Sequence, residues 1–374
     1  MNKKEYIIIP GIVVIWITLT VFGLLLTLLA YDIYRKVWVV VKAKHIDVIR
    51  VSVKTRLESF LSGSESKFND GLKAFEMEIL HKNKSYLYLV DEYLLAVIET
   101  SSPKLRKRVI AIAQCLDFFP SCLAEINDKN PIISARGSRR AGLYNFEAAA
   151  DDMLAALDVF SSENQFEILM GLARMGKGKH LEQAFDKIKN NVIVNERAVI
   201  EILSAFPKGR EKKKLFRSLI QHETSFLKAL FLKAADKELT KSLLNDITML
   251  LTDINKEVRA AAVRALATLE ELAPGKELIQ ALKDSDWEVR ALAAKALGSI
   301  HIKEASLALV SVLDDRQWWI RQNAANALIC HPGYDKLFIR ALKTKDKYSR
   351  DSIISALESK GNTALIKKIN KMVI

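Results

Sequence analysis

The sequence predicts an all-α fold in which one N-terminal transmembrane helix precedes an α-solenoid of about nine helix pairs. Three observations lead to this prediction. An apolar, uncharged run lies near the N-terminus, a repeating pattern fills the C-terminal half, and glycine and proline are scarce, at 14 and 7 of 374 residues. Sheet-rich folds and glycine-rich nucleotide-binding domains need many tight turns, so this scarcity disfavours them.

The composition is that of a folded protein without disulfide bonds. Hydrophobic residues make up 50% and charged residues 27%, which is too apolar for a disordered chain. Lys and Arg number 57 against 44 Asp and Glu, which gives a net charge of +13. The three cysteines, Cys115, Cys122 and Cys330, are too few for a disulfide framework and lack the spacing of metal ligands.

The first thirty residues contain the expected membrane span. No charged residue occurs from Tyr6 to Tyr31, and the run from Ile7 to Ala30 is mostly apolar. At about 1.5 Å per residue, this run is long enough for a hydrocarbon core of about 30 Å. The alternative is a cleaved signal peptide, whose apolar core is shorter and ends in a small-x-small site. The longer run and the poor cleavage site around Ala30 favour a retained anchor.

Charges on the two sides of this span predict its orientation. Lys3 and Lys4 precede it. Seven cations follow it before residue 57, namely Arg35, Lys36, Lys42, Lys44, Arg50, Lys54 and Arg56. The positive-inside tendency then places the N-terminus outside and the solenoid in the cytoplasm of a single-pass membrane protein.

Between the span and the repeats, helical spacing of apolar residues predicts a basic stalk helix. A polar segment rich in Ser and Gly follows it and has the composition of a flexible linker. The expected order is a short tail (1–5), the transmembrane helix (6–31), the stalk (32–61), the linker (62–71) and the solenoid (72–374), which is clearest over 253–358 and ends in a cap helix (363–374).

An internal repeat dominates the C-terminal half. Four segments align, at residues 255–266, 286–297, 317–328 and 346–357. Each carries an arginine at the same place, namely Arg259, Arg290, Arg321 and Arg350. Stepping back by the same interval reaches Lys228 and Arg197, and fainter units follow near Gln165, Arg136 and Arg106. Such a period indicates stacked supersecondary units.

Each unit is expected to contain two amphipathic helices joined by a short polar turn. Alanines in the second helix, such as Ala262 and Ala265, allow close helix packing. Asn255, Asp286 and Asp346 are expected at N-cap positions, and Ser102 before a proline has the same role in an early unit. Asp253, Asp284 and Asp315 each precede the repeated arginine by six residues. Stacking is expected to bring these arginines and aspartates together in a ladder of charge-assisted hydrogen bonds.

The pattern Asp-x-x-Val-Arg-x-x-Ala-x-x-Ala-Leu resembles the HEAT repeat family, including the bacterial HEAT-like units related to phycobilisome-lyase repeats. The resemblance implies an α-solenoid whose second helices line an inner face and whose role is usually to bind proteins. Ser349 in place of valine and Lys228 in place of arginine depart from the pattern. They put in doubt the regularity of those two steps, but not the fold.

No catalytic constellation emerges from the sequence, so we expect no enzyme, metal or cofactor. The six histidines are scattered, with no two-histidine metal motif. Gly176 to Lys179 superficially suggests a phosphate-binding loop, but no strand precedes it, and a turn between helices is the better interpretation.

Three tryptophans are candidate partner-binding residues. Trp287 and Trp318 occupy the same repeat position just after the N-cap, and Trp319 adds a third ring. One interpretation is that these rings cover the joints between repeats. The other is a binding hot spot, because tryptophan offers large contact area at low entropy cost.

Two groups of cations form a second set of candidates. Five residues after the ladder position stand Lys233, Arg264, Lys295 and then Asn326, which predicts a basic stripe on the second helices. A second cluster, interpreted as a basic surface turn, comprises Lys208, Arg210, Lys212, Lys213 and Lys214. Both are either solvated surface or binding sites for an acidic protein segment, an anionic lipid surface or nucleic acid.

These features favour a membrane-tethered adaptor that holds a protein partner at the membrane. By resemblance to anchored bacterial HEAT proteins, cell-envelope machinery such as a polysaccharide-forming glycosyltransferase is the expected partner. The alternative is a basic nucleic-acid-binding protein similar to HEAT-like DNA glycosylases. The membrane anchor and the lack of an acid beside stacked aromatic residues disfavour it. A bilin lyase or isomerase has no support beyond the repeat itself.

Overall fold

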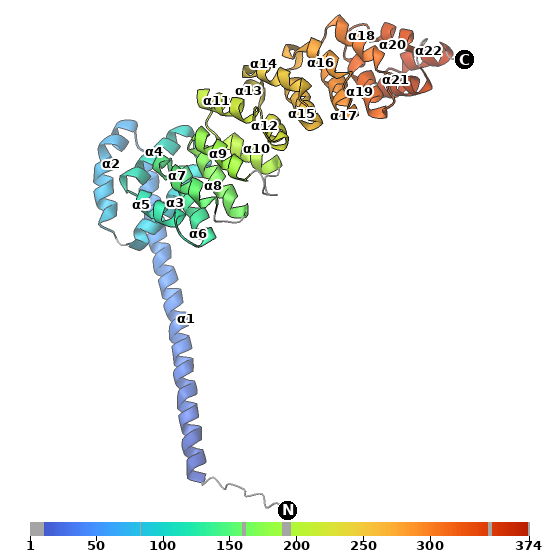
Figure 1. Cartoon of the computed structure of the whole chain (residues 1–374). Helices are drawn as coiled ribbons and strands as arrows, with labels where there is room; N and C mark the ends of the chain where they lie inside the picture. Colours follow the sequence, from blue (N-terminus) through green and yellow to red (C-terminus); the bar gives the residue numbers. More distant parts are fainter. Residues whose placement is uncertain (1–10, 83, 159–161, 189–195, 343–345, 373–374) are drawn as a thin grey trace, which may run out of the picture. The chain divides into compact units, whose positions relative to one another are not determined.

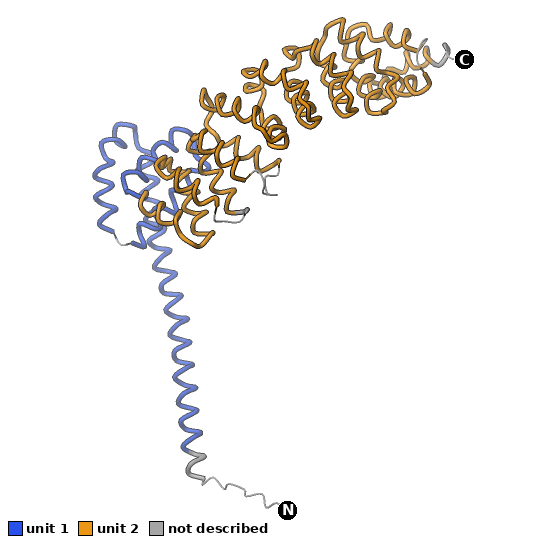
Figure 2. The backbone as a smooth tube through the Cα atoms, in the orientation of Figure 1, with its two compact units in different colours: residues 1–118 blue, residues 119–374 orange. Residues whose placement is uncertain are grey.

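The described residues of the chain, 11–82, 84–158, 162–188, 196–342 and 346–372 of the computed structural model, form 22 α-helices and four short 3₁₀-helices, with no strand among them. The chain divides into two compact units, residues 1–118 and 119–374 (Figure 2). The predicted all-α class is therefore confirmed. The predicted tail 1–5 and the first residues of the predicted span lie outside the described residues.

Unit 1 contains four helices, and α1 (Gly11–Ser62) is by far the longest (Figure 1). Its apolar portion is long and apolar enough to cross a membrane, and none of that window is buried inside the protein. The end of α1 is different, because Val53, Leu57 and Leu61 are buried. The same helix contacts α3 (Lys84–Thr100) and α4 (Pro103–Cys115). The predicted span and stalk are thus one unbroken helix over the described residues.

The predicted linker 62–71 is wrong, because α2 (Glu65–Leu80) occupies most of it. Ser64 caps this helix, with its hydroxyl accepting from the N–H of Lys67. Phe68 and Phe75 on α2 pack against the ring of Phe60, with centroid separations of 5.0 and 4.4 Å. The polar composition suggested a linker. However, Phe68 and Phe75 lie on the same face of α2, and their packing on Phe60 holds α2 against the end of α1.

Buried Arg108 of α4 fastens the end of α1. Its Nη1 donates to the carbonyl oxygens of Leu61 and Gly63, and its guanidinium lies 4.9 Å from the Phe68 ring centroid. The last carbonyls of a helix lack partners within the helix, so a cation there satisfies them and complements the helix dipole. Ser102 caps α4 at its N-cap with Pro103 next, as predicted.

Unit 2 is a succession of antiparallel helix pairs. The first helices of the pairs are α5 (Phe119–Ile126), α7 (Ala150–Ala156), α9 (Gly178–Ile188), α11 (Arg210–Leu219), α13 (Lys237–Ser242) with α14 (Leu244–Met249), α16 (Gly275–Ala281), α18 (Lys303–Ser311) and α20 (Tyr334–Leu342). The second helices are α6 (Pro131–Tyr144), α8 (Ser162–Arg174), α10 (Glu196–Ala205), α12 (Ser225–Lys233), α15 (Lys256–Ala267), α17 (Trp287–Ala296), α19 (Trp318–Ile329) and α21 (Lys347–Ser359). The last helix, α22 (Thr363–Met372), packs on α21 as the predicted cap, whose last two residues lie outside the described part.

The two kinds of helix form two layers. Each second helix contacts the next second helix, and first helices contact first helices from α5 to α11 and from α16 to α20. In Figure 1, α15, α17, α19 and α21 lie along one side of unit 2, and α14, α16, α18 and α20 along the other. The helix pairs of unit 2 begin at α5, whereas the first part of the predicted solenoid 72–374 lies in unit 1, where α2–α4 pack with the end of α1.

Small residues bring the second helices close together. A Cβ atom on Gly142 of α6 would lie 2.4 Å from the Cα of Gly171 of α8, so only glycine fits this crossing. In later repeats alanines have this role, and Ala262 and Ala293 are fully buried. Close approach of successive helices seals one pair on the next and makes the core continuous.

The predicted N-caps are present, with one difference. Asn255 and Asp346 accept hydrogen bonds from the N–H groups of Glu257 and Ser349. Asp286 occupies the N-cap of α17 but caps no N–H. Its Oδ2 instead accepts from Arg259 of the preceding repeat at 3.2 Å. Contact between repeats replaces a local cap there.

Candidate functional site

An ion-pair ladder links the four repeats from α12 to α19. Arg259 donates through Nε and Nη2 to the carboxylate of Asp284, at 2.7 and 2.8 Å. Arg290 does the same with Asp315, at 3.0 and 3.4 Å. One step earlier, Lys228 donates to Asp253 at 2.9 Å. Each cation therefore reaches the aspartate of the following repeat. Lys228, although it replaces the arginine of the family pattern, still belongs to the ladder, with one hydrogen bond instead of two.

Each ladder arginine also closes its own turn. Nη1 of Arg259 donates to the carbonyl oxygens of Asp253 and Ile254, and Nη1 of Arg290 to those of Asp284 and Ser285. Burial alone raises the pKa of Asp284, but bonds from Arg259 and the N–H of Asp286 outweigh it, so this pKa lies below its usual value. The ladder holds the turn, the helix start and the next repeat together, which is a structural role.

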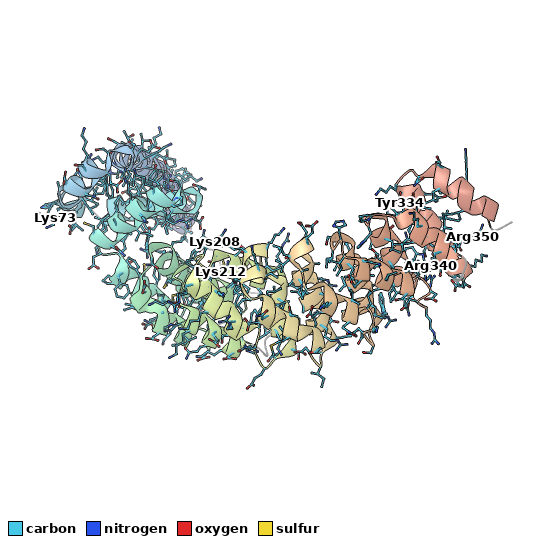
Figure 3. The ribbon with its side chains drawn as sticks, turned by 90° about the horizontal axis from the view of Figure 1, so that it is seen from above. Lys73, Lys208, Lys212, Tyr334, Arg340 and Arg350 are labelled. Atoms are coloured by element: carbon cyan, nitrogen blue, oxygen red, sulfur yellow. The ribbon has the colours of Figure 1, made fainter. Side chains whose placement is uncertain are left out.

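The ladder changes at the C-terminal end. Arg321 donates to the carbonyls of Asp315 and Arg316, and its guanidinium lies 5.3 Å from the ring centroid of Tyr348. The aspartate position of the next repeat is Thr344, outside the described residues. Arg350 forms no ion pair within the described part, and it lies with Tyr334 and Arg340 at the C-terminal end of the array (Figure 3).

The early repeats keep the turn without the arginine. Asp128 accepts from the N–H of Asn130 at 2.7 Å, as Asp253 does from Asn255 at 2.9 Å. This register puts Ser134, and not Arg136, at the ladder position, and the Ser134 hydroxyl donates to the carbonyl of Ile126. The unit predicted near Arg136 is therefore present as α6, with its ladder position two residues earlier.

The three tryptophans stand at the N-terminal ends of neighbouring second helices, on a surface that we name the tryptophan rim (Trp287, Trp318 and Trp319). Trp318 and Trp319 expose 49% and 56% of their surface, and Trp287 exposes 38%. The rings of Trp318 and Trp319 meet edge to face with centroids 4.6 Å apart. Tyr348, at the start of α21, is 61% exposed and extends this set, which the sequence analysis missed. Its signal was the position two residues before Arg350, which is the position of Trp319 before Arg321.

The predicted basic stripe is only partly free. Lys233 forms an ion pair with Glu196 at 2.8 Å. Arg264 and Lys295 make no ion pair among the described residues. They flank a shallow cleft between α15 and α17, of about 370 Å³, with Leu292 among its apolar lining residues. Asn326 instead accepts from the side chain of Gln322.

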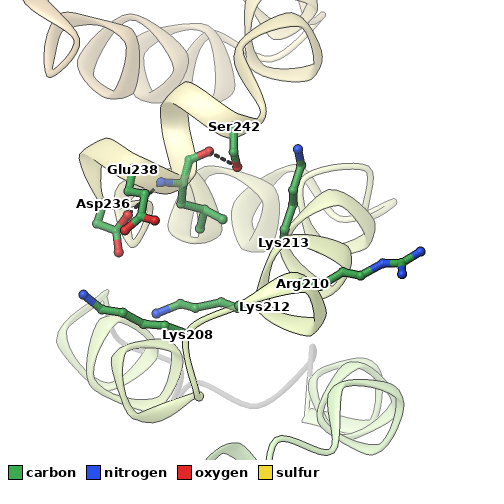
Figure 4. Close-up of a pocket in the computed structure, with 9 residues that line it drawn as sticks. Lys208, Arg210, Lys212, Lys213, Asp236, Glu238 and Ser242 are labelled. Atoms are coloured by element: carbon green, nitrogen blue, oxygen red, sulfur yellow. Dashed lines mark hydrogen bonds between the residues drawn. The ribbon is translucent and has the colours of Figure 1, made fainter.

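The predicted basic surface turn is mostly helical, and one of its five cations is buried. Only Lys208 and Gly209 precede α11, and Arg210 begins the helix. Lys212 is not on the surface, since it is 8% exposed. It shares the buried stripe of Leu215, Phe216 and Leu219 in helical spacing, whereas Lys214 is exposed. Figure 4 shows Lys208 and Lys212 beside the pocket that they line.

Groups that could support catalysis are few in the described part of the chain. No group of three or more His, Cys, Asp or Glu there could hold a metal ion. The Ser306 hydroxyl lies 2.9 Å from Nδ1 of His331, whose Nε2 lies 2.9 Å from the carbonyl of Leu297. Both residues are buried, so this pair is a satisfied polar contact in the core. Gly176 adopts a φ of 70° in the turn between α8 and α9, as expected for a helix end.

Repeated helix pairs, a shared turn and a ladder between neighbours define an α-solenoid repeat protein. A family model for HEAT repeats matches residues 244–329 and 275–358. Residues 244–358 therefore match the model for HEAT repeats, and the resemblance seen in the sequence is confirmed over that range. A search of curated proteins gave no match.

Solved structures with similar helix arrangements include one engineered protein and two natural ones. The engineered protein is 17% identical, with 83% of this chain and 98% of that chain covered and a TM-score of 0.34. Kap121p is 12% identical over 81% of this chain and 46% of its own, with a TM-score of 0.34. A chain of the Pds5–Scc1 complex is 11% identical, covering 79% and 64%, with a TM-score of 0.31.

Proposed function

We propose that this protein is a membrane-anchored scaffold whose HEAT-repeat array holds a protein partner through the tryptophan rim. The exposure of Trp318 and Trp319 is the observation that carries this proposal. Two adjacent indole rings at half exposure are costly in water and enriched at protein interfaces. The ladder beneath them fixes successive helix starts, so the rim is preorganised and loses little entropy on binding. This role needs no catalytic residue.

The membrane part of the proposal rests on α1. Leu19, Leu24 and Leu25, which point to different sides of the helix, are all exposed, and a helix apolar all round is suited to lipid. The cations that follow favour a cytoplasmic array and an external N-terminus. Several of them are paired, as Arg56 is with Glu78 and Lys36 with Asp32, but Arg35 and Lys44 have no ion pair in the described part.

For the partner we propose a protein confined to the same membrane. Tethering raises the effective concentration of two membrane-bound proteins and allows a weak interface to suffice. The specific candidate is cell-envelope machinery such as a polysaccharide-forming glycosyltransferase. This candidate comes from the family resemblance alone.

The test is quantitative capture from detergent-solubilised membranes. The full-length chain and its double variant Trp318→Ala/Trp319→Ala are used as baits, and co-purifying membrane proteins are compared by mass spectrometry. Loss of one or more specific proteins with the double variant is expected. Tyr88→Ala is the matched control, because Tyr88 is 64% exposed but lies in unit 1. Equal capture by the wild type and the double variant, with equal thermal stability, would contradict the proposal.

The runner-up is nucleic-acid binding through the cleft of Arg264 and Lys295. These two cations lack counter-ions in the described residues, which favours it. Lys233 is neutralised by Glu196, which shortens the stripe and opposes it. A duplex-binding titration of the full chain in detergent separates the two functions. Affinity that falls steeply with salt and is lost in Arg264→Gln/Lys295→Gln would replace the scaffold proposal.

A further inference from the structure

A second pocket lies away from the rim, in the layer of first helices. It is formed between the start of α11 and the short helix α13 and encloses about 290 Å³. Lys208, Gly209, Arg210 and Lys212 line it from one side. Asp236, Glu238, Leu239 and Ser242 line it from the other side. The scaffold proposal makes no use of this pocket.

Lys212 is the unusual residue of this pocket. It is 92% buried, yet it forms no hydrogen bond and no ion pair in the described part of the chain. Its Nζ lies 5.9 Å from the centroid of its own helix's Phe216 ring, which is a weak contact. Burial lowers the pKa of Lys212, against the opposing effect of Asp236. The side chain is therefore buried while its ammonium reaches the pocket without a bonded counter-ion, which is an unfavourable arrangement for a lysine and needs an explanation.

The surrounding carboxylates do not supply that partner. Asp236 caps α13, and its Oδ1 accepts from the N–H of Leu239 at 2.8 Å. Glu238 is exposed and forms no ion pair with either lysine. Figure 4 shows Lys208 and Lys212 extending to the same side, near Asp236, whereas Arg210 extends in the other direction. Two ammonium groups therefore face the pocket without a bonded counter-ion.

The start of α11 adds further donors for an anion. Gly209 occupies the N-cap with a φ of 135° and has no side chain that could cap the helix. The first N–H groups of the ten-residue helix thus point out of its end without a side-chain acceptor. Lys208 and Arg210 at this end oppose the helix dipole, which Glu211 in the first turn offsets only in part, and the dipole favours further negative charge there. A bound anion would accept hydrogen bonds from these N–H groups and would also offset the positive charge at the helix N-terminus.

We propose that this pocket binds a phosphate group, as inorganic phosphate or as a phosphate monoester, between Lys208, Lys212 and the first N–H groups of α11. A doubly charged oxyanion offers acceptors for two ammonium groups and for backbone donors together. A singly charged carboxylate is repelled less by Asp236 and Glu238, but it offers fewer acceptors and is attracted less by the two ammonium groups and the helix N-terminus. The site is therefore selective for phosphate over acetate.

The experiment measures phosphate binding to the full-length chain in detergent at low ionic strength, by calorimetry. Inorganic phosphate and glycerol 3-phosphate are the probes, and acetate is the comparison anion. Lys212→Met removes the charge and keeps most of the volume. Lys214→Met is the matched control, because it makes the same charge change on the same helix outside the pocket. Thermal unfolding is recorded for each variant without ligand.

Lys212→Met is expected to weaken binding of at least one phosphate probe tenfold or more, and Lys214→Met to change it less than twofold. The unfolding temperature of Lys212→Met should equal or exceed that of the wild type, because an apolar side chain replaces a charged one on the buried face of α11. Tighter binding of glycerol 3-phosphate than of inorganic phosphate identifies a monoester site, and the reverse identifies a free-ion site. Wild-type protein that binds neither probe, or acetate as tightly as phosphate, overturns the proposal. So do equal losses in both variants, or a lower unfolding temperature for Lys212→Met.

Discussion

Arg259 and Asp284 belong to successive repeats and meet through two parallel N–H···O bonds of 2.7 and 2.8 Å. Their side chains expose only 12% and 9% of their surface. The same guanidinium binds two carbonyls of its own turn. One arginine therefore fixes a turn, a helix start and the junction to the next repeat.

Removing this arginine should destabilise unit 2 strongly. Arg259→Met leaves the Asp284 carboxylate buried without its main partner, for which a loss of about 3 kcal/mol in unfolding free energy is expected. Urea unfolding of the full chain measures this loss. Lys237→Met is the control, since its ion pair with Glu270 is exposed and worth less than about 1 kcal/mol. Equal effects of the two substitutions would show that the ladder does not support the array.

The glycine crossing of α6 and α8 should tolerate no side chain. In Gly142→Ala the new Cβ would lie 2.4 Å from the Cα of Gly171, so the two helices must move apart. Overpacking of this kind costs about 1–3 kcal/mol. Gly178→Ala is a suitable comparison, because its nearest neighbour would be 3.6 Å away. A change in thermal unfolding of similar size for both variants would argue against the crossing.

The stability of the array should fall as the pH drops below about 6.5. Burial lowers the pKa of His331, with a smaller contribution in the same direction from His301 and an opposing one from the carbonyl of Leu297. The unfolded state then binds more protons than the folded state, so stability present above the unfolded pKa is lost as the pH falls through the folded one. His331→Gln should start less stable and show a flatter profile between pH 7 and 5. An unchanged slope in unfolding temperature against pH would exclude His331 as the cause.

Charge in the apolar part of α1 should prevent membrane insertion if the anchor proposal is correct. An arginine near the centre of a span opposes insertion by about 3 kcal/mol. We expect Leu25→Arg to move much of the chain from the carbonate-resistant membrane fraction to the soluble one. Val48→Arg, in an exposed position nearer the buried end of α1, should leave the distribution unchanged. Retention of Leu25→Arg in the membrane would contradict the anchor.

The parts of the fold that were predicted correctly are those in which the sequence is periodic. The repeated arginine and aspartate located α15, α17, α19 and α21, since a pattern of fixed period leaves one register for each pair. Where a residue of another type stands at the ladder position, as Ser134 does, the sequence located the unit only approximately, near Arg136. The linker failed for a related reason, because Phe68 and Phe75 meet Phe60 of another helix, and this contact has no period in the sequence.

The amino-acid sequence by itself determined the helical class, the apolar N-terminal run and the repeat whose neighbours form HEAT units. Those properties follow from local spacing, which a linear pattern records. Only the tertiary structure decided which cations are free, since Glu196 reaches Lys233 from another repeat while nothing reaches Lys212 in the described residues. It also decided which tryptophans remain exposed. Both depend on how neighbouring helix pairs stack, and that stacking is a property of contacts between distant residues.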